Sequence, residues 1–174
     1  MLRSSCGRVI GFVTSLSLVG LLFAIVHPGQ PASPPQPVVE KTITACAAVT
    51  RADVELALGR PVAGGKEERD GAASTCDYDG GAGQVTITVQ RLAVKLDIPA
   101  EMAALKAAIP DSNAREAAGI GARAFFLDIA GAGTQLHVIH GERNYLMVSV
   151  LGFGEAAEVS AAAERMARKA LARL

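Results

Sequence analysis

Apolar residues beyond residue 40 recur with two different periods, and the longer period predicts three helices. The first helix follows Thr50, which suits an N-cap, and ends at Gly59, which accommodates a left-handed backbone. The second helix spans about residues 100–109 and the third about residues 155–172. Each carries its apolar side chains along one stripe, so each is expected to pack on a core by one face.

A period of two predicts strands between these helices. Residues 85–90 and 123–129 each gather apolar side chains on one face, whereas residues 145–151 are apolar on both sides and indicate a central strand. Three turn sequences are typical of hairpins, at residues 79–81, 131–133 and 141–144. The order is helix, about three strands, helix, about four strands, helix. It predicts an α+β domain with a largely antiparallel sheet and packed helices, and it hints at two helix-plus-strands halves.

The start of the chain has a different pattern. Residues 9–26 contain no charged side chain, and Arg3 and Arg8 precede them. As a helix this run would reach about 27 Å, close to the thickness of the hydrocarbon core of a bilayer. Residues 1–27 are therefore expected to be a signal anchor or signal peptide that contacts the membrane through residues 9–26. Because no A-x-A cleavage sequence follows, a retained anchor is favoured over a cleaved signal.

Residues 28–44 form a linker that contains five of the eight prolines. Such a stretch favours extended polyproline geometry and acts as a semi-rigid spacer. With Arg3 and Arg8 in the cytoplasm, the domain over residues 45–174 is expected to be extracytoplasmic on a single-pass membrane protein. If the signal is cleaved, the domain is instead secreted or periplasmic.

Two of the three cysteines, Cys46 and Cys76, belong to this domain. Outside the cytoplasm a lone pair of cysteines favours a disulfide over a metal site, and no nearby histidine completes a tetrahedral set. Cys6 precedes the apolar run and is expected to stay a free cytoplasmic thiol. The predicted site residues are thus the structural disulfide Cys46–Cys76.

The charge balance argues against one class of partner. The chain has 17 basic and 17 acidic residues, and removing Arg3 and Arg8 leaves 15 − 17 = −2 beyond the anchor. A domain with this balance has no concentrated positive field for nucleic acid. Nucleic acid is therefore not expected as a partner.

Several patterns suggest chemistry but have simpler explanations. Residues 152–157 match G-x-G-x-x-A between a strand and a helix, yet no second parallel strand follows, so the glycines are expected to serve a tight turn.

His137 and His140 fall on opposite faces of a strand and cannot share a metal ion. Each is expected to be a surface or strand-end residue. Asp77 and Asp79 begin like a calcium loop, but the rest of the ligand set is missing.

Carboxylates are the remaining candidates for catalysis. Glu67, Glu68 and Asp70 cluster in a charged run that resembles a solvated loop or a strand edge. No serine occurs in G-x-S-x-G, and the expected disulfide removes the thiol nucleophiles. No catalytic residue, cofactor or metal is predicted, and paired carboxylates stay open as an alternative.

Four segments carry a resemblance to known proteins: CAAVTRADVELALGRPV, CDY, GIGARAFF and the terminal amphipathic helix. Together they resemble a family of small secreted or lipid-anchored cell-envelope proteins of high-GC bacteria that is catalogued as a domain of unknown function. The resemblance covers about residues 46–174 and implies a non-catalytic envelope domain. This chain differs in having no lipid-attachment cysteine after its apolar run.

Three functions are compatible with these features. The favoured one is a membrane-anchored or secreted binding or interaction module that takes an unknown envelope protein, peptide or lipid. The alternative is a small envelope hydrolase that uses carboxylates. A third possibility is a structural part of a larger envelope assembly.

Overall fold

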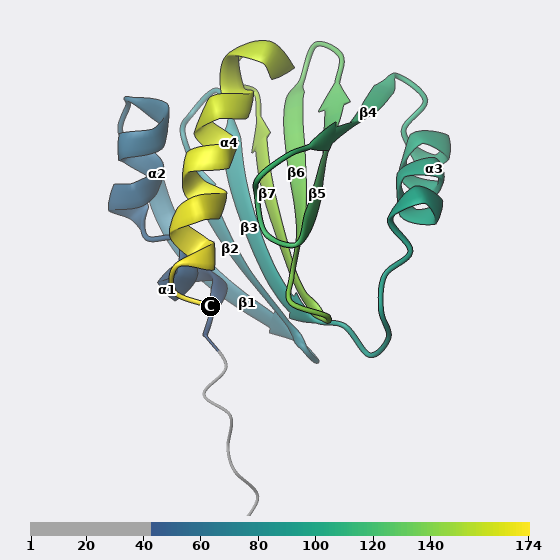
Figure 1. Ribbon diagram of the computed structural model, residues 1–174. Helices are drawn as coiled ribbons and strands as arrows, with labels where there is room; N and C mark the ends of the chain where they lie inside the picture. Colours follow the sequence, from purple (N-terminus) through teal and green to yellow (C-terminus); the bar gives the residue numbers. More distant parts are fainter. Residues whose placement is uncertain (1–42) are drawn as a thin grey trace, which may run out of the picture. The chain divides into compact units, whose positions relative to one another are not determined.

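The computed structural model describes residues 43–174. The predicted membrane segment, residues 9–26, and nearly all of the linker lie outside the described residues. Within residues 43–174, no helix combines the length and apolar character needed to span a bilayer. This part of the chain folds as an α+β domain with seven antiparallel strands and four helices (Figure 1). The predicted α+β class with a largely antiparallel sheet is thus confirmed.

The elements follow the expected order, with one additional short helix at the start. In chain order they are α1 (Ala45–Ala48), α2 (Arg51–Leu58), β1 (Ala63–Asp70), β2 (Ala73–Asp79), β3 (Gln84–Arg91), α3 (Ile98–Ala108), β4 (Ser112–Ala117), β5 (Arg123–Ile129), β6 (Gly133–His140), β7 (Asn144–Leu151) and α4 (Ala156–Leu171).

The strands form one sheet in the order β1-β2-β3-β7-β6-β5-β4. Two meanders, β1–β3 and β4–β7, therefore meet where β3 pairs with β7. β7 lies in the middle of the sheet, which confirms the central strand predicted from its two apolar faces. The three predicted hairpin turns connect β2 to β3, β5 to β6 and β6 to β7. At Gly133, a Cβ atom would lie 2.2 Å from the Val150 carbonyl oxygen, so glycine is required there.

The main core lies between the sheet and the layer of α1, α2 and α4 (Figure 1). Alternate residues of the central strands, such as Val85 and Val148, are fully buried on this face. α4 contributes Met166 and several alanines, including Ala163, and these small side chains let the helix approach the sheet closely. The amphipathic stripe predicted for the last helix is thus the surface that closes the core.

The ends of α2 are as predicted. The Thr50 side chain accepts from the Asp53 backbone N–H, and the Asp53 carboxylate accepts from the Thr50 backbone N–H, which completes a capping box. Gly59 ends the helix with a φ of +69°, a conformation that favours glycine. α3 begins two residues earlier than predicted, after an N-cap at Asp97.

α3 packs against the other face of the sheet and makes a second, smaller core with Phe125, Ile139 and Tyr145. The expectation that His137 is a surface or strand-end residue is wrong. His137 is only 3% exposed, and its ring stacks on Phe125 with centroids 4.5 Å apart. The alternation of β6 places residue 137 on the same face as Ile139, within this second core. His140 does lie at the end of its strand.

The imidazole of His137 is held in its neutral form. Its Nδ1 lies 2.7 Å from the Tyr145 hydroxyl, and its buried Nε2 has no hydrogen-bond partner in the structure. Burial lowers the pKa of His137 from 6.5 to about 4, because a charged imidazolium loses its hydration in this core.

We expect His137 to make stability depend on pH. Between about pH 6.5 and pH 4 the unfolded chain binds a proton at His137 that the folded protein does not bind. The free energy of unfolding therefore falls as the pH decreases through this window, by about 3 kcal/mol in total. In His137→Gln this part of the pH dependence should vanish, as measured by urea unfolding followed by circular dichroism at several pH values. His140→Gln is the control and should behave like the wild type; an unchanged pH dependence in His137→Gln would contradict the assignment.

Candidate functional site

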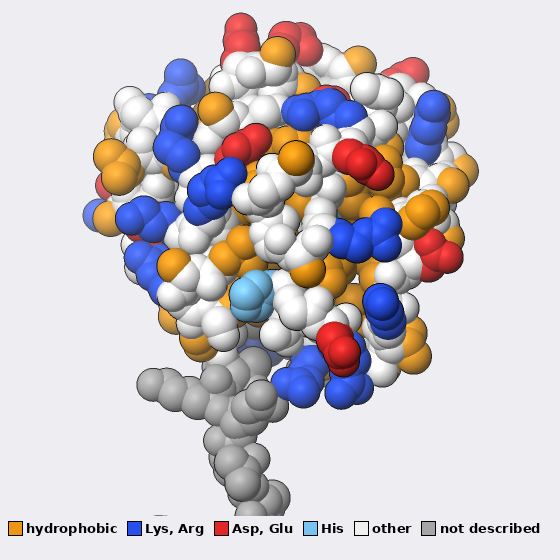
Figure 2. All heavy atoms as spheres, in the orientation of Figure 1, with side chains coloured by type: hydrophobic (Ala, Val, Ile, Leu, Met, Phe, Trp, Pro, Cys, Tyr) orange, Lys and Arg blue, Asp and Glu red, His pale blue; other side chains and the backbone are white. Residues whose placement is uncertain are grey.

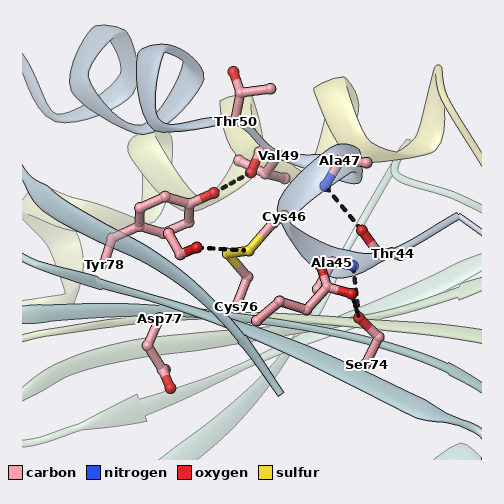
Figure 3. The surroundings of a disulfide bond; sticks show 12 residues. Thr44, Ala45, Cys46, Ala47, Val49, Thr50, Ser74, Cys76, Asp77 and Tyr78 are labelled. Atoms are coloured by element: carbon pink, nitrogen blue, oxygen red, sulfur yellow. Dashed lines mark hydrogen bonds between the residues drawn. A yellow bond between two sulfur atoms is a disulfide. The ribbon is translucent and has the colours of Figure 1, made fainter. Parts of the chain in front are cut away.

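The predicted pair Cys46 and Cys76 forms a disulfide (Figure 3). Cys46 lies in α1 and Cys76 in β2, with their Cα atoms 5.1 Å apart. The bond therefore ties the segment before α2 to a strand of the sheet. The Gly65 carbonyl oxygen lies 3.4 Å from the Cys46 sulfur. This is a packing contact, because a disulfide sulfur carries no hydrogen to donate.

Two hydrogen bonds reinforce this attachment (Figure 3). The Ala45 backbone N–H donates to Ser74 Oγ at 2.8 Å, and the Tyr78 hydroxyl donates to the Val49 carbonyl at 2.5 Å. Tyr78 is buried, and burial raises its pKa to about 12, so the hydroxyl keeps its proton. The chain that leads into α2 is thus attached to β2 at both ends of α1. The surroundings of the disulfide therefore indicate a structural role for it.

The acidic residues considered for catalysis lie on β1, an edge strand. Glu68 pairs with Lys66 at 2.6 Å, and this pair lowers the pKa of Glu68. For Glu67, burial favours the protonated form, but hydrogen bonds from Thr44, Ser74 and Arg69 outweigh it and lower the pKa. Adjacent strand residues point to opposite faces, so these two carboxylates do not converge. The charged run is a strand edge, and such charges protect an edge from unwanted pairing.

The glycines of residues 152–157 build the turn between β7 and α4, as expected. A Cβ atom at Gly152 would lie 2.5 Å from the Ala82 carbonyl oxygen, and one at Gly154 would lie 2.2 Å from the Glu158 carboxylate. The Glu158 carboxylate accepts from the Glu155 backbone N–H at 3.2 Å. It therefore occupies the helix N-terminus where a dinucleotide fold would hold a phosphate.

The remaining candidate metal ligands either lie on opposite faces of a strand or already accept hydrogen bonds. His137 and His140 lie on opposite faces of β6, as predicted. Asp77 accepts from the Thr86 hydroxyl at 2.6 Å, and Asp79 accepts from the Gly81 backbone N–H at 2.7 Å within the hairpin turn. Within residues 43–174, no group of three or more His, Cys, Asp or Glu side chains is placed to hold a metal ion.

A groove lies between α2 and α4. Its volume is about 420 Å³, and its lining residues are Asp53, Leu56, Ala57, Arg165, Arg168, Lys169 and Ala172. Figure 2 views this side of the molecule and shows Lys and Arg side chains gathered over the two helices. We call this feature the α2–α4 groove.

Cross-links between the two helices hold the groove in shape. Arg165 donates to the Ala57 carbonyl at 2.6 Å. Arg173, just beyond α4, donates to the Asp53 carboxylate at 2.6 Å and to the Ala48 carbonyl at 2.8 Å. The Arg173 guanidinium holds the pKa of Asp53 far below its usual range. These contacts connect α4 and the residues just beyond it to α1 and α2.

Leu56 is a large, exposed apolar side chain in the lining of the groove. It is 75% exposed, and among the described residues Val94 is the one other large apolar side chain as exposed as this. The buried stripe of α2 is made by Val54 and Ala57 instead. Leu56 was not singled out in the sequence. The sequence feature that could have identified Leu56 is its position outside the buried apolar stripe of a short amphipathic helix.

A second hollow of about 310 Å³ lies near the β1–β2 turn and the C-terminal Leu174. Its wall includes Ile43, the residue at which the described chain begins, together with Arg69 and Ser74. The α2–α4 groove has the more apolar lining of the two.

We expect the disulfide to stabilise the domain by about 3–4 kcal/mol, since it closes a loop of 30 residues. Cys46→Ala/Cys76→Ala should lower the urea midpoint by a corresponding amount without abolishing the fold. Alkylation of denatured, non-reduced protein should modify Cys6 alone, as read by mass spectrometry, and Cys6→Ser is the matched control for the midpoint. Alkylation of all three cysteines would show that the bond does not form in the cell.

Comparisons of the chain with models of protein families, with curated protein sequences and with solved structures found no match.

Proposed function

We propose that the protein is a cell-envelope binding module, anchored in the membrane or secreted, that acts without catalysis and holds its ligand in the α2–α4 groove. The ligand belongs to the classes expected from the sequence: an envelope protein, a peptide or a lipid. The observation that carries the proposal is the exposed Leu56 in a groove whose walls are fixed by Arg165 and Arg173.

The size and lining of the groove support this role. A volume of about 420 Å³ falls in the range of ligand sites. Burial of a leucine side chain stabilises a protein by about 1.5–3 kcal/mol. The isolated domain forgoes this stabilisation by leaving Leu56 exposed beside the side chains of several cationic residues. A concave apolar surface with a polar rim is typical of interaction sites.

The location rests on the start of the chain and on the disulfide. Residues 9–26 are proposed to anchor the protein, with the domain held on the extracytoplasmic side by the proline-rich linker. A disulfide in a small domain is typical of oxidising compartments. The resemblance of residues 46–174 to envelope proteins of high-GC bacteria favours the same location.

The electrostatics favour binding over hydrolysis by carboxylates. A general acid needs a carboxyl group whose pKa is raised toward neutrality. Asp53, Glu67 and Glu68 are the carboxyls of the described residues with resolved shifts, and the pKa of each is lowered. Arg173 holds Asp53 ionised and Lys66 holds Glu68 ionised, whereas Glu67 is held ionised by hydrogen bonds from Thr44, Ser74 and Arg69. Such partners give these carboxylates a structural role.

Binding in the groove is tested with anilinonaphthalene sulfonate, a dye that combines an apolar ring system with an anionic group. We expect saturable enhancement of its fluorescence by the wild type and about tenfold weaker binding by Leu56→Ser, because the apolar contact is lost. Val94→Ser, at the other equally exposed apolar side chain, should bind the dye like the wild type. Equal binding by Leu56→Ser and wild type would contradict the proposed site.

The anchor is tested by fractionation. Wild-type protein should sediment with membranes and resist extraction by alkaline carbonate, because residues 9–26 are long enough to span the hydrocarbon core. Deletion of residues 9–26 should abolish both properties. Recovery of the intact wild-type protein in the soluble cytoplasmic fraction would contradict the proposed location.

A further inference from the structure

The cationic side chains of the α2–α4 groove all come from one wall. Arg165, Arg168 and Lys169 line it from α4, and spacings of three and four residues place them on one face of that helix. Leu56 and Ala57 line it from α2. An occupant therefore meets positive charge on one side and apolar side chains on the other.

The positive charge of this wall is not neutralised within the groove. Asp53 is the one acidic lining residue, and its carboxylate is bonded to Arg173. Arg168 forms an ion pair with Glu164 on the same helix, with the guanidinium nitrogen and the carboxylate oxygen 3.8 Å apart. Within residues 43–174, Lys169 makes no ion pair. Its exposed ammonium is available to an acidic group of an occupant.

The walls of the groove are two helices, and the element that fits between two helices is a third. An amphipathic helix would bury Leu56 under its apolar stripe, as in other helix-in-groove complexes. Acidic side chains beside that stripe, spaced by four residues, would face Arg165 and Lys169. Pairs of this kind set partner choice along the flanks of coiled coils.

Other occupants match the wall less well. Two copies of this chain meeting groove to groove would bring like charges together. A single lipid concentrates its negative charge at one headgroup, whereas Arg165 and Lys169 are separated by about 6 Å along the axis of α4. A row of cations parallel to a helix axis favours a row of acids on a second helix.

We infer that the α2–α4 groove binds an acidic amphipathic helix of a partner protein, an inference that rests on the proposed binding role of the groove. The apolar stripe of the partner covers Leu56, and its acidic residues pair with Lys169 and Arg165.

The test uses the full-length protein in phosphatidylcholine nanodiscs and a labelled synthetic helix of about 18 residues, long enough to cover the groove. The peptide has leucines on one stripe and glutamates beside it, and a matched peptide replaces each glutamate by lysine. Fluorescence anisotropy should show binding of the acidic peptide, none of the basic peptide, and a loss of affinity as salt is added.

Four variants locate the contact. Leu56→Ser should weaken binding of the acidic peptide about tenfold, and Lys169→Glu about fivefold to tenfold through loss of one ion pair and gain of a repulsion. Val94→Ser changes an equally exposed apolar side chain outside the groove, and Lys95→Glu changes an exposed lysine outside it. Both variants should leave the affinity unchanged. Equal affinity of Lys169→Glu and wild type would overturn the inference.

The outcomes separate this inference from the proposed function. If the acidic peptide fails to bind while the dye still binds in a Leu56-dependent manner, the helix partner is excluded and the binding role stands. If neither probe depends on Leu56, both fail. Binding to vesicles of phosphatidylglycerol that requires Leu56 and Lys169, without binding of the peptide, would replace the protein partner by a lipid surface.

Discussion

The disulfide between Cys46 and Cys76 is the constraint on which the arrangement of the outer helices depends. α2 packs mainly on α4 and contacts the sheet chiefly along β1, and its Val54 and Ala57 side chains enter the main core. The disulfide, with the hydrogen bonds of Ser74 and Tyr78, fixes the chain immediately before α2 on β2. From that fixed point α2 reaches α4, where arginines bond to it at both ends of the contact. The groove is the space left between two helices that are held side by side.

The sheet separates two environments of opposite chemistry. On the α3 face, His137 is buried against Phe125 as a neutral ring, and its titration affects stability. On the other side, the groove lies on the outer surface of the helical layer and keeps its charges in contact with solvent.

Much of the fold follows from local patterns in the sequence. The periods of the apolar residues, the cap at Thr50 and the stop at Gly59 predict the helices and the central strand, because each depends on neighbours within a few positions. The burial of His137 was missed, because it depends on α3 crossing that face of the sheet, a long-range feature. The single turn of α1 was also missed, since a helix of four residues is too short to show a helical period of apolar residues. The groove could not be predicted, because Leu56 becomes notable only once α4 is known to lie beside it.

The most direct test of the account is photo-cross-linking in intact cells from a benzoylphenylalanine placed at position 56. The account predicts a discrete cross-linked product that disappears when Lys169→Glu is added, and no such product from the same probe at position 94. Absence of any product from position 56, or identical products from both positions, would contradict the claim that the α2–α4 groove is the binding surface of this protein.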